Sequence, residues 1–426
     1  MQATKLAVGK QRIKIDYLAR VEGEGGLDVE LSDGQIARLH LNIFEPPRLF
    51  EAFLEGRSYD ELPDLTARIC GICPVAYQMS SVYAAEDAFG LRVDGQLRQL
   101  RRLLYCGEWI ESHLLHVYLL ALPDFLGYPD AFRMAEKYSK ELQAGLRMKR
   151  LGNDVVALLG GREIHPVSAM VGGFTRVPTR EELLPLLEPL ERGKEEAIKA
   201  VRWLGGLALP DLTRDIEFVA LSHPDEYAMI EGRMVSSKGL DVAIADFENH
   251  IESRQVPYSS ALHYSLKGRG AYFVGPLARV NLGFDRLSPD AQQAARDSGI
   301  PFPNSNPFTS IVARMVEVVH AMDLAAQIVE EYERPAPHVE VQPRATRGCG
   351  VTEAPRGSLY HSYLFDEQGL VRSATIVPPT AQNQRQIEED LRDYLPRLRH
   401  LSREDATLRC EMAIRNYDPC ISCSTH

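Results

Sequence analysis

Four of the seven cysteines occur as two pairs, each with two residues between its members. Cys70 and Cys73 lie in the run Arg-Ile-Cys-Gly-Ile-Cys-Pro, and Cys420 and Cys423 lie in Asp-Pro-Cys-Ile-Ser-Cys. Thiolates bind soft metals, and two pairs with this spacing could supply a complete four-sulfur site. On spacing alone, the commonest metal in such a site is tetrahedral zinc.

The separation of the two pairs argues against an ordinary zinc ribbon, whose pairs are about 15–20 residues apart. Here nearly the whole chain lies between Cys73 and Cys420. A site that joins the two ends of a large fold is more often catalytic than structural. A thiol–disulfide couple would account for one pair but not for two, so a metal site is favoured and the metal stays open.

The residues beside the cysteines indicate how each pair is positioned. Proline is favoured at the first position of a helix, so Pro74 places Cys73 near a helix N-cap. The partial positive charge of a helix N-terminus stabilises a thiolate there. In the second motif, Pro419 is expected to hold Asp418 in an extended conformation.

Hydrophobic periodicity predicts a helix-rich α+β chain. Near the N-terminus, Leu27–Leu31 and Ile36–Ile43 alternate in polarity around an Asp33-Gly34 turn, which predicts a β-hairpin. A helix over Pro74–Phe89 should stop at Gly90, and Thr179 with Glu182 forms a capping box for another helix. The helix capped at Thr179 is expected to end near Leu204. Further helices are expected at about Asp94–Leu122 and at Pro307–Glu331. Further strands are expected at Ile216–Leu221, Leu359–Phe365 and Leu370–Val377.

These elements predict one domain over residues 1–426, because no Gly/Ser-rich or Pro-rich linker divides the chain. We expect a central bundle of long helices within about 74–331 and small antiparallel sheets from the first and last quarters. The hairpin region covers about 12–45, the first cysteine motif 68–77, and the C-terminal strand region with the second motif about 338–426. The active site would then be buried between the two ends.

Composition excludes several functional classes. The 426 residues are 45% hydrophobic and 25% charged, as in folded proteins with a large core. The net charge is −11 and the basic residues are scattered, so no nucleic-acid partner is expected. Apolar stretches such as Val117–Leu122 are far shorter than the roughly 18 residues of a membrane span. We expect a soluble protein without direct membrane insertion.

Together, the two cysteine motifs and the final residue His426 resemble the large subunit of nickel-iron hydrogenases. Further segments resemble that family in the same order along nearly the whole chain. The resemblance implies reversible conversion of dihydrogen into two protons and two electrons. These segments are Arg20–Gly23, Arg48–Glu51, Gly160–Pro166, Gly275–Arg279 and Glu353–Gly357.

The resemblance implies a role for each cysteine. Cys70, Cys73, Cys420 and Cys423 would bind nickel, and Cys73 and Cys423 would also bridge to an iron that carries CO and two cyanides. Soft thiolates suit such a centre. Cys420 would accept the proton from dihydrogen cleavage, and Glu22 would pass it outward.

Other site residues are also implied by the resemblance. Pro355 and Arg356 would lie beside the iron, where the guanidinium can donate to a cyanide, and Asp418 would lie close to Arg356. Pro379 stands where some members place a serine that contacts a cyanide. Glu51 and His426 resemble the ligands of a Mg2+ ion, with a backbone carbonyl near Thr375 as a third ligand.

Three departures from the family pattern indicate a subgroup. Tyr77 stands where the first motif normally has a histidine. Glu24 stands where many family members have a histidine, and Ser112 stands where some members have an aspartate. These differences favour the cytoplasmic, bidirectional, NAD(P)-linked branch. His113 and His116 share a helical face and could bind a metal, but packing is the favoured interpretation.

The cysteine count also predicts partners. No cluster ligand set remains after four cysteines are used, so electrons should leave through another polypeptide. The resemblance implies that this partner is an iron–sulfur small subunit, and the subgroup implies NAD(P)-reducing diaphorase subunits beyond it. Family precursors are cut after nickel insertion, so the end at His426 predicts a mature form made by a maturation protease and nickel-insertion proteins. The alternatives are a metal-free quinone-site subunit resembling that of respiratory complex I, which retention of the cysteines disfavours, and a structural four-cysteine zinc protein.

Overall fold

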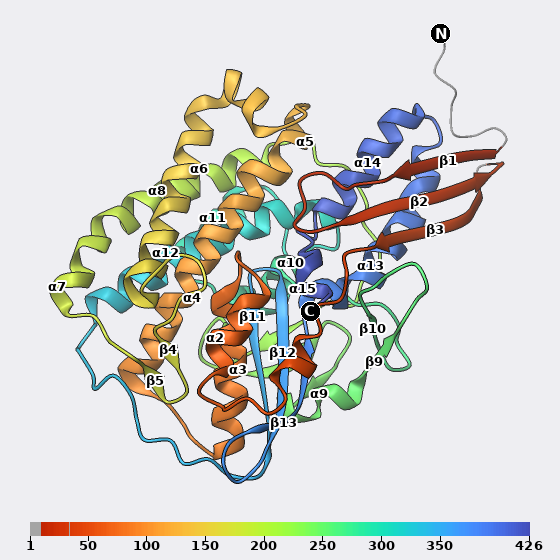
Figure 1. Ribbon diagram of the computed structural model, residues 1–426. Coiled ribbons are helices and arrows are strands. Elements are labelled where there is room, and N and C mark those ends of the chain that lie inside the picture. Colours follow the sequence, from red (N-terminus) through yellow and green to blue (C-terminus); the bar gives the residue numbers. More distant parts are fainter. Residues whose placement is uncertain (1–9, 34) are drawn as a thin grey trace.

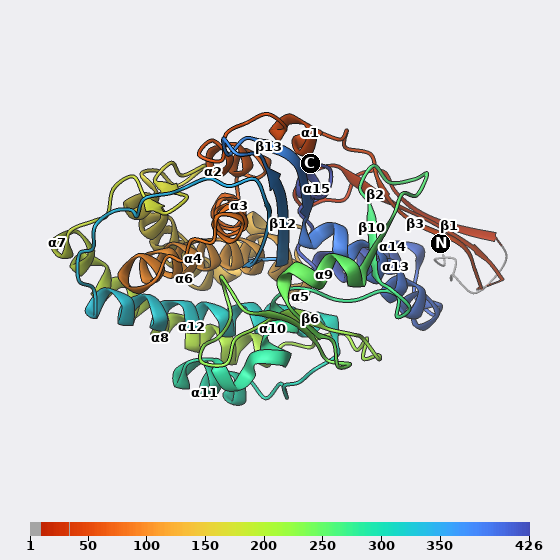
Figure 2. The same cartoon turned by 90° about the horizontal axis from the view of Figure 1, so that it is seen from below.

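Long helices form the bulk of the molecule in a computed structural model that describes residues 10–33 and 35–426. Helix α4 packs against α6 and α12, and α12 packs against α8 (Figures 1 and 2). The helix-rich α+β class predicted from the sequence is therefore confirmed. The four helices are α4 (Gly95–Leu115), α6 (Ala131–Gly160), α8 (Leu187–Gly205) and α12 (Ser310–Glu330).

Side-chain character decides which helix is innermost. Helix α12 is apolar on nearly all sides and almost wholly buried, whereas α8 exposes a charged face. Helices α4 and α6 approach closely where Gly107 faces Gly152. A Cβ atom at Gly152 would lie 2.7 Å from the carbonyl oxygen of Gly107, so the contact requires glycine. The bundle is a closely packed support for the residues at its edge.

An antiparallel sheet in the order β1-β2-β3 forms the N-terminal region. Its strands are β1 (Lys10–Ile15), β2 (Gly25–Ser32) and β3 (Gln35–Ile43). The predicted hairpin is β2 and β3, and β1 adds a strand to it. Leu27, Val29 and Leu31 point into the core, as the alternation indicated. Gly34 of the predicted turn lies outside the described residues.

A second antiparallel sheet lies against α3 (Pro74–Phe89), which has the predicted bounds and ends at Gly90 with a φ of 66°. The order is β11-β12-β13. The expected strands at Leu359–Phe365 and Leu370–Val377 are β12 and β13, and β11 was not predicted. The bounds are β11 (Arg347–Ala354), β12 (Gly357–Phe365) and β13 (Val371–Val377).

Strands also occur within the predicted helical core, in addition to the small sheets expected from the first and last quarters. All of these strands have two to four residues, too few to show an alternating pattern. Only the run Ile216–Leu221 had indicated a strand here, and it overlaps β6. They are β4 (Ala169–Met170), β5 (Gly173–Phe174), β6 (Val219–Ser222), β7 (Arg233–Ser236), β8 (Asp241–Val242), β9 (Ile251–Arg254) and β10 (His263–Leu266).

The helix expected at about Asp94–Leu122 is not continuous. Helix α4 ends at Leu115, a π-helical segment follows over His116–Ala121, and α5 is Leu122–Leu126. Pro123 near the start of α5 has no N–H group, so it cannot continue the α-helical hydrogen bonding. The capping box at Thr179 and Glu182 is present as predicted. The remaining helices are α1 (Phe50–Leu54), α2 (Leu62–Thr66), α7 (Arg180–Leu183), α9 (Ile244–His250), α10 (Pro276–Gly283), α11 (Pro289–Asp297), α13 (Pro379–Tyr394), α14 (Arg403–Arg415) and α15 (Ile421–Ser424).

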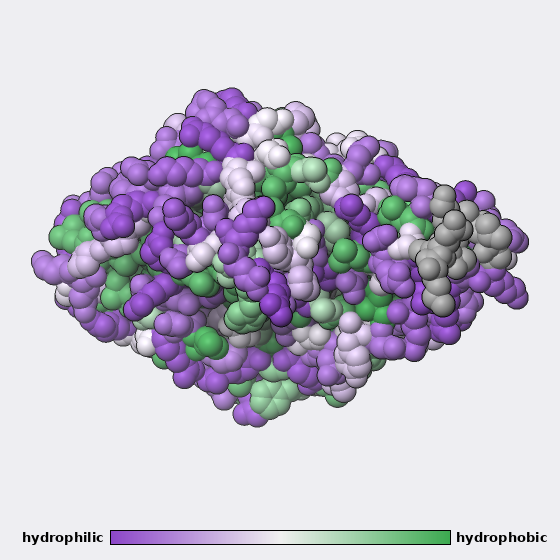
Figure 3. Space-filling view, turned by 90° about the horizontal axis from the view of Figure 1, so that it is seen from above, coloured by the Kyte–Doolittle hydropathy of each residue, from purple (hydrophilic) through white to green (hydrophobic). Residues whose placement is uncertain are grey.

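The C-terminus lies beside α15 (Figure 1) and, in the second view, close to α1 near one face of the molecule (Figure 2). The main hydrophobic core extends from Ile13 to Cys423, so the two ends of the chain share it. The face shown in Figure 3 is mostly polar, with apolar side chains in small groups. In residues 10–33 and 35–426, no helix combines the length and apolarity needed to cross a membrane.

Candidate metal centre

The four cysteines of the two motifs meet at one buried point. The Sγ atoms of Cys70 and Cys420 are 3.6 Å apart, and those of Cys73 and Cys423 are 3.7 Å apart. All four sulfur atoms lie within 4.8 Å of one another. These separations match four thiolates around one metal with bonds of about 2.3 Å. The cluster therefore has the donor set of a soft-metal site.

The first pair is positioned by the start of α3. Cys73 is the N-cap residue, as predicted, but its side chain makes no capping hydrogen bond. Instead, the buried carboxylate of Glu108 on α4 accepts from the amides of Val75 at 2.6 Å and Ala76 at 3.1 Å. Glu108 thus satisfies helix-terminal donors that an N-cap side chain would otherwise bind. The sulfur of Cys73 is left free for a metal.

The second pair is held by residues from distant parts of the sequence. The Cys420 amide donates to Thr380 Oγ1 at 3.0 Å, and the Ile421 amide donates to the carbonyl of Glu22 at 2.9 Å. The extended conformation expected for Asp418 is wrong, because its φ is +51°. Aspartate tolerates this left-handed conformation, which here follows the end of α14 and turns the chain toward Cys420.

The charge of the cluster favours a bound cation. Burial raises the pKa of the Cys420 and Cys423 thiols, whereas a hydrogen bond with Cys420 lowers the pKa of Cys70. Four thiolates at these distances repel one another in a site with little water. A metal cation would compensate that charge, so metal binding and deprotonation are expected together.

Glu22 lies directly beside this cluster. Its Oε2 atom accepts from Cys420 Sγ at 3.0 Å and from the Ser422 amide at 3.1 Å. The side chain is half-buried, between the sulfur and the outer surface. A carboxylate in direct contact with a thiol on one side and close to solvent on the other can transfer a proton.

Arg356 and Asp418 form a buried pair next to the thiols. Arg356 Nε donates to the Asp418 carbonyl at 2.8 Å, and NH2 donates to Asp418 Oδ1 at 3.2 Å. Burial opposes the charge of Arg356, but Asp418 and the nearby thiols raise its pKa. Its NH1 atom is buried and has no partner among the described residues, so it fits an acceptor such as a metal-bound cyanide. Pro355 precedes it, and Pro379 starts α13 next to Thr380.

Glu51 and His426 meet at a small cleft that also involves Ile376. The cleft has a volume of about 80 Å³, and His426 Nε2 is 3.8 Å from Glu51 Oε1. His426 Nδ1 contacts the Cys423 carbonyl at 2.8 Å, and a carbonyl only accepts, so Nδ1 carries a proton and, in the neutral ring, Nε2 keeps a lone pair. This arrangement fits a cation. Glu51 Oε1 also accepts from the Ile376 amide at 2.6 Å, next to the half-buried Thr375.

Tyr77, His113 and His116 do not join the sulfur cluster as ligands. Burial raises the pKa of Tyr77, whose hydroxyl has no partner among the described residues. His113 Nε2 is 2.9 Å from Glu317 Oε2, and His116 Nε2 is 2.7 Å from the Arg415 carbonyl, as expected for packing histidines. The sequence assigned no role to Glu108 or Thr380, because neither lies near one of the four clustered cysteines in the chain.

Comparison with known proteins shows the family of the chain. The profile of the family described as nickel-dependent hydrogenase matches residues 48–146 and 265–426. Sulfhydrogenase 2 subunit alpha from Pyrococcus furiosus is 35% identical over 97% of this chain and 98% of its own length. Sulfhydrogenase 1 subunit alpha from the same organism is 33% identical over 97% of each chain.

Structural comparison agrees with this result. The crystal structure of an NAD+-reducing NiFe-hydrogenase in its reduced state has a TM-score of 0.88, with 27% identity and coverage of 100% of both chains. The four buried sulfur atoms and the matched sequence therefore point to the same conclusion. The chain belongs to the nickel-dependent hydrogenases and is a large subunit of that family.

Proposed function

We propose that this chain is the catalytic subunit of a hydrogenase that passes electrons to an iron–sulfur small subunit and on to NAD(P). The observation that carries the proposal is the group of four buried sulfur atoms within 4.8 Å of one another. A nickel-iron centre with CO and two cyanides on the iron would supply the heterolytic cleavage of dihydrogen there. Cys70 and Cys420 would be terminal ligands of nickel, and Cys73 and Cys423 would bridge both metals.

Glu22 moves the proton in this proposal. The contact of 3.0 Å between Cys420 Sγ and Glu22 Oε2 is within hydrogen-bond reach, so a proton held on that sulfur can pass to the carboxylate. The Ser422 amide also donates to Oε2 and keeps the carboxylate aimed at the sulfur. Proton exchange with solvent then depends on Glu22.

Arg356 orients the iron ligands, and Asp418 orients Arg356. The Asp418 carbonyl accepts from Arg356 Nε, and the Asp418 carboxylate accepts from Arg356 Nη2. The Nη1 atom is therefore left to donate to a cyanide nitrogen. Pro355 and Pro379 are apolar neighbours that limit the entry of water. Both prolines are buried.

A hard cation, Mg2+ in this proposal, ties the C-terminus in place. Glu51 supplies a carboxylate oxygen, His426 supplies Nε2, and a carbonyl near Thr375 supplies a third ligand. The cation would lie in the cleft between these residues. Support comes from the protonation of His426 at Nδ1, which leaves Nε2 available.

The partners follow from electron flow. The curated relatives are named as alpha subunits, and the similar solved structure is named as an NAD+-reducing enzyme. Electrons must leave the buried centre, and this chain has no second cluster of four cysteines within the described residues. An iron–sulfur subunit with NAD(P)-reducing diaphorase subunits, in the cytoplasm, meets this need. Assembly proteins, including a maturation protease, would act while the thiols are still open for nickel insertion.

Copurification tests this assignment. A tagged chain, expressed in its natural host, should bring down an iron–sulfur subunit, and the complex should reduce NAD+ or NADP+ with dihydrogen. A preparation that reduces an artificial dye with dihydrogen but never reduces NAD(P) would contradict NAD(P) as the electron acceptor. It would leave the hydrogenase activity itself in place. A fully active isolated chain would contradict the need for a partner.

A further inference from the structure

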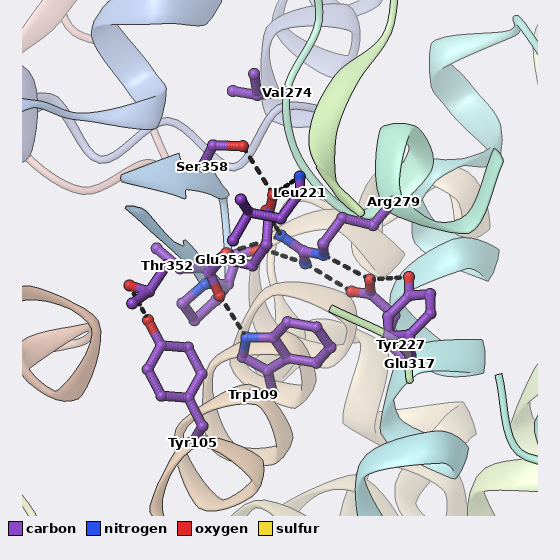
Figure 4. Close-up of polar contacts among 12 residues, drawn as sticks. Tyr105, Trp109, Leu221, Tyr227, Val274, Arg279, Glu317, Thr352, Glu353 and Ser358 are labelled. Carbon is purple, nitrogen blue, oxygen red and sulfur yellow. Dashed lines mark hydrogen bonds and ion pairs between the residues drawn. The ribbon is translucent and has the colours of Figure 1, made fainter. Parts of the chain in front are cut away.

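Two segments that resemble the hydrogenase family pack against each other: Gly275–Arg279 and Glu353–Gly357. Figure 4 shows the contact between Arg279 and Glu353. Arg279 on α10 points at the turn that precedes Arg356. Its NH1 atom donates to the Ala354 carbonyl at 2.8 Å, and NH2 donates to the Pro355 carbonyl at 3.1 Å. Arg279 therefore binds the backbone on the N-terminal side of Arg356.

Two buried carboxylates hold Arg279 in turn. Glu317 on α12 accepts from Nε and NH2, both at 2.7 Å, and Glu353 accepts from NH1 at 3.1 Å. A guanidinium has five N–H donors, and each of the five has an acceptor here. The Trp109 ring also lies 4.4 Å from the Arg279 guanidinium carbon, which fixes its plane.

The turn itself is fixed from its other side. Trp109 Nε1 donates to the Glu353 carbonyl at 2.9 Å, and Ser358 Oγ and the Leu221 amide each donate to Glu353 Oε1 at 2.7 Å (Figure 4). Tyr227 donates to Glu317 at 2.7 Å. The whole network is buried, so displacing one member leaves unpaired polar groups without water.

Backbone contact adds to these bonds. Gly275 has a φ of 126°, and a Cβ atom there would lie 2.9 Å from the Arg356 carbonyl. The Arg356 carbonyl therefore packs closely against Gly275, which lies four residues before Arg279. Both ends of the segment Gly275–Arg279 therefore contact the turn that includes Arg356.

We propose that Arg279 is a positioning residue for Arg356, and that segment Gly275–Arg279 sets how the Arg356 guanidinium stands over the four cysteines. This inference rests on the proposed function, because the group that Arg356 meets is the nickel-iron centre. Lysine at position 279 keeps the positive charge but has three donors in place of five. It cannot hold both carboxylates and both carbonyls, so the turn should move.

The experiment compares Arg279→Lys with Arg101→Lys in the purified complex. Arg101 is a matched control because it is also buried and forms a bidentate pair, with Glu86 at 2.8 and 2.6 Å, while its other hydrogen bond goes to Met170. Both variants should lose thermal stability. Only Arg279→Lys should shift the cyanide stretching bands, and Arg356→Lys should shift the same bands.

Hydrogen–deuterium exchange gives a readout independent of metal loading. Amides of residues 353–358 should exchange faster in Arg279→Lys than in wild type, and at wild-type rates in Arg101→Lys. Misplacement of Arg356 should lower kcat/KM by about 10- to 100-fold. Wild-type bands and exchange rates in Arg279→Lys would overturn the proposal.

Two further outcomes are defined. If Arg279→Lys does not fold, Gly275→Ala pushes on the Arg356 carbonyl instead, and unchanged bands and exchange in that variant would overturn the inference. If the wild type shows no CO or cyanide bands at all, the proposed function fails. The exchange measurement then still decides whether Arg279 positions the turn.

Discussion

The two cysteine pairs are built in different ways. Cys70 and Cys73 lie at the start of α3, a helix of 16 residues packed against a sheet and α4. Cys420 and Cys423 lie on either side of the start of α15, a helix of four residues near the end of the chain. The first pair is supported by regular structure, and the second by contacts with Glu22 and Thr380.

This difference indicates an order of assembly. A short isolated helix is not stable by itself, so the second pair acquires its geometry from tertiary contacts. Arg48 joins the two halves, since its side chain donates to the carbonyls of Ile69 and Ser422. We infer that the first pair forms with the main core and that the C-terminal pair closes over it.

The largest effect should come from replacing one sulfur of either pair. Cys73→Ser and Cys423→Ser substitute a hard, protonated oxygen for a soft thiolate, so nickel should be lost and dihydrogen turnover should be undetectable. Metal analysis of the purified chains measures this directly. We expect the same loss of nickel and turnover in both variants, because both cysteine pairs are needed to bind the metal. Retention of full nickel in either variant would contradict a shared site.

Glu22→Gln should have the next largest effect and should separate proton transfer from metal binding. An amide cannot accept and release the proton, so turnover and hydrogen–deuterium exchange with solvent should fall by about 100- to 10,000-fold. Metal content should stay unchanged, because Gln keeps an oxygen for the Ser422 amide. Glu24→Gln, on an exposed neighbour, is the control. Wild-type exchange in Glu22→Gln would remove this residue from the path.

Glu108→Leu tests the support of the first pair. The variant leaves the Val75 and Ala76 amides buried without an acceptor, and each such donor costs about 1–3 kcal/mol. Chemical denaturation should show a loss of about 2–6 kcal/mol. Glu108→Gln keeps one acceptor oxygen and should lose less. Equal stability of the Leu and Gln variants would mean that these hydrogen bonds contribute little.

The smallest effect is expected at the second pair. Thr380→Val removes the one acceptor of the Cys420 amide, so about 1–3 kcal/mol should be lost. The change should appear mainly as faster amide exchange in residues 418–426, because this segment closes last. Thr407→Val, at a half-buried threonine on α14, provides the control. Slower or unchanged exchange in the C-terminal segment would contradict the inferred order.

Local signals predicted the parts of the fold with strong local causes. Pro74 and Gly90 bound α3, and the pair Thr179 and Glu182 caps α7, because each signal acts within a few residues. The short strands of the third quarter depend on tertiary pairing, and most were missed. The π-helical segment at His116–Ala121 was also missed, because its apolar pattern resembles a continuing helix.

The site was predictable to a similar extent. The spacing of the cysteines indicated a metal site, and resemblance supplied Glu22, Arg356 and His426 as candidates. The roles of Glu108 and Arg279 could not be found in this way, although Arg279 ends a segment that resembles the family, since both residues act on backbone groups far away in the sequence. The left-handed Asp418 was missed for a related reason. The rule for residues before proline describes an average preference, which here gives way to the buried pair with Arg356.

Metal analysis combined with infrared spectroscopy of the purified wild-type complex tests the central claim most directly. The account predicts one nickel and one iron per copy of this chain, with stretching bands for one CO and two cyanides. One zinc per chain, with no such bands in a preparation that is properly folded, would contradict it.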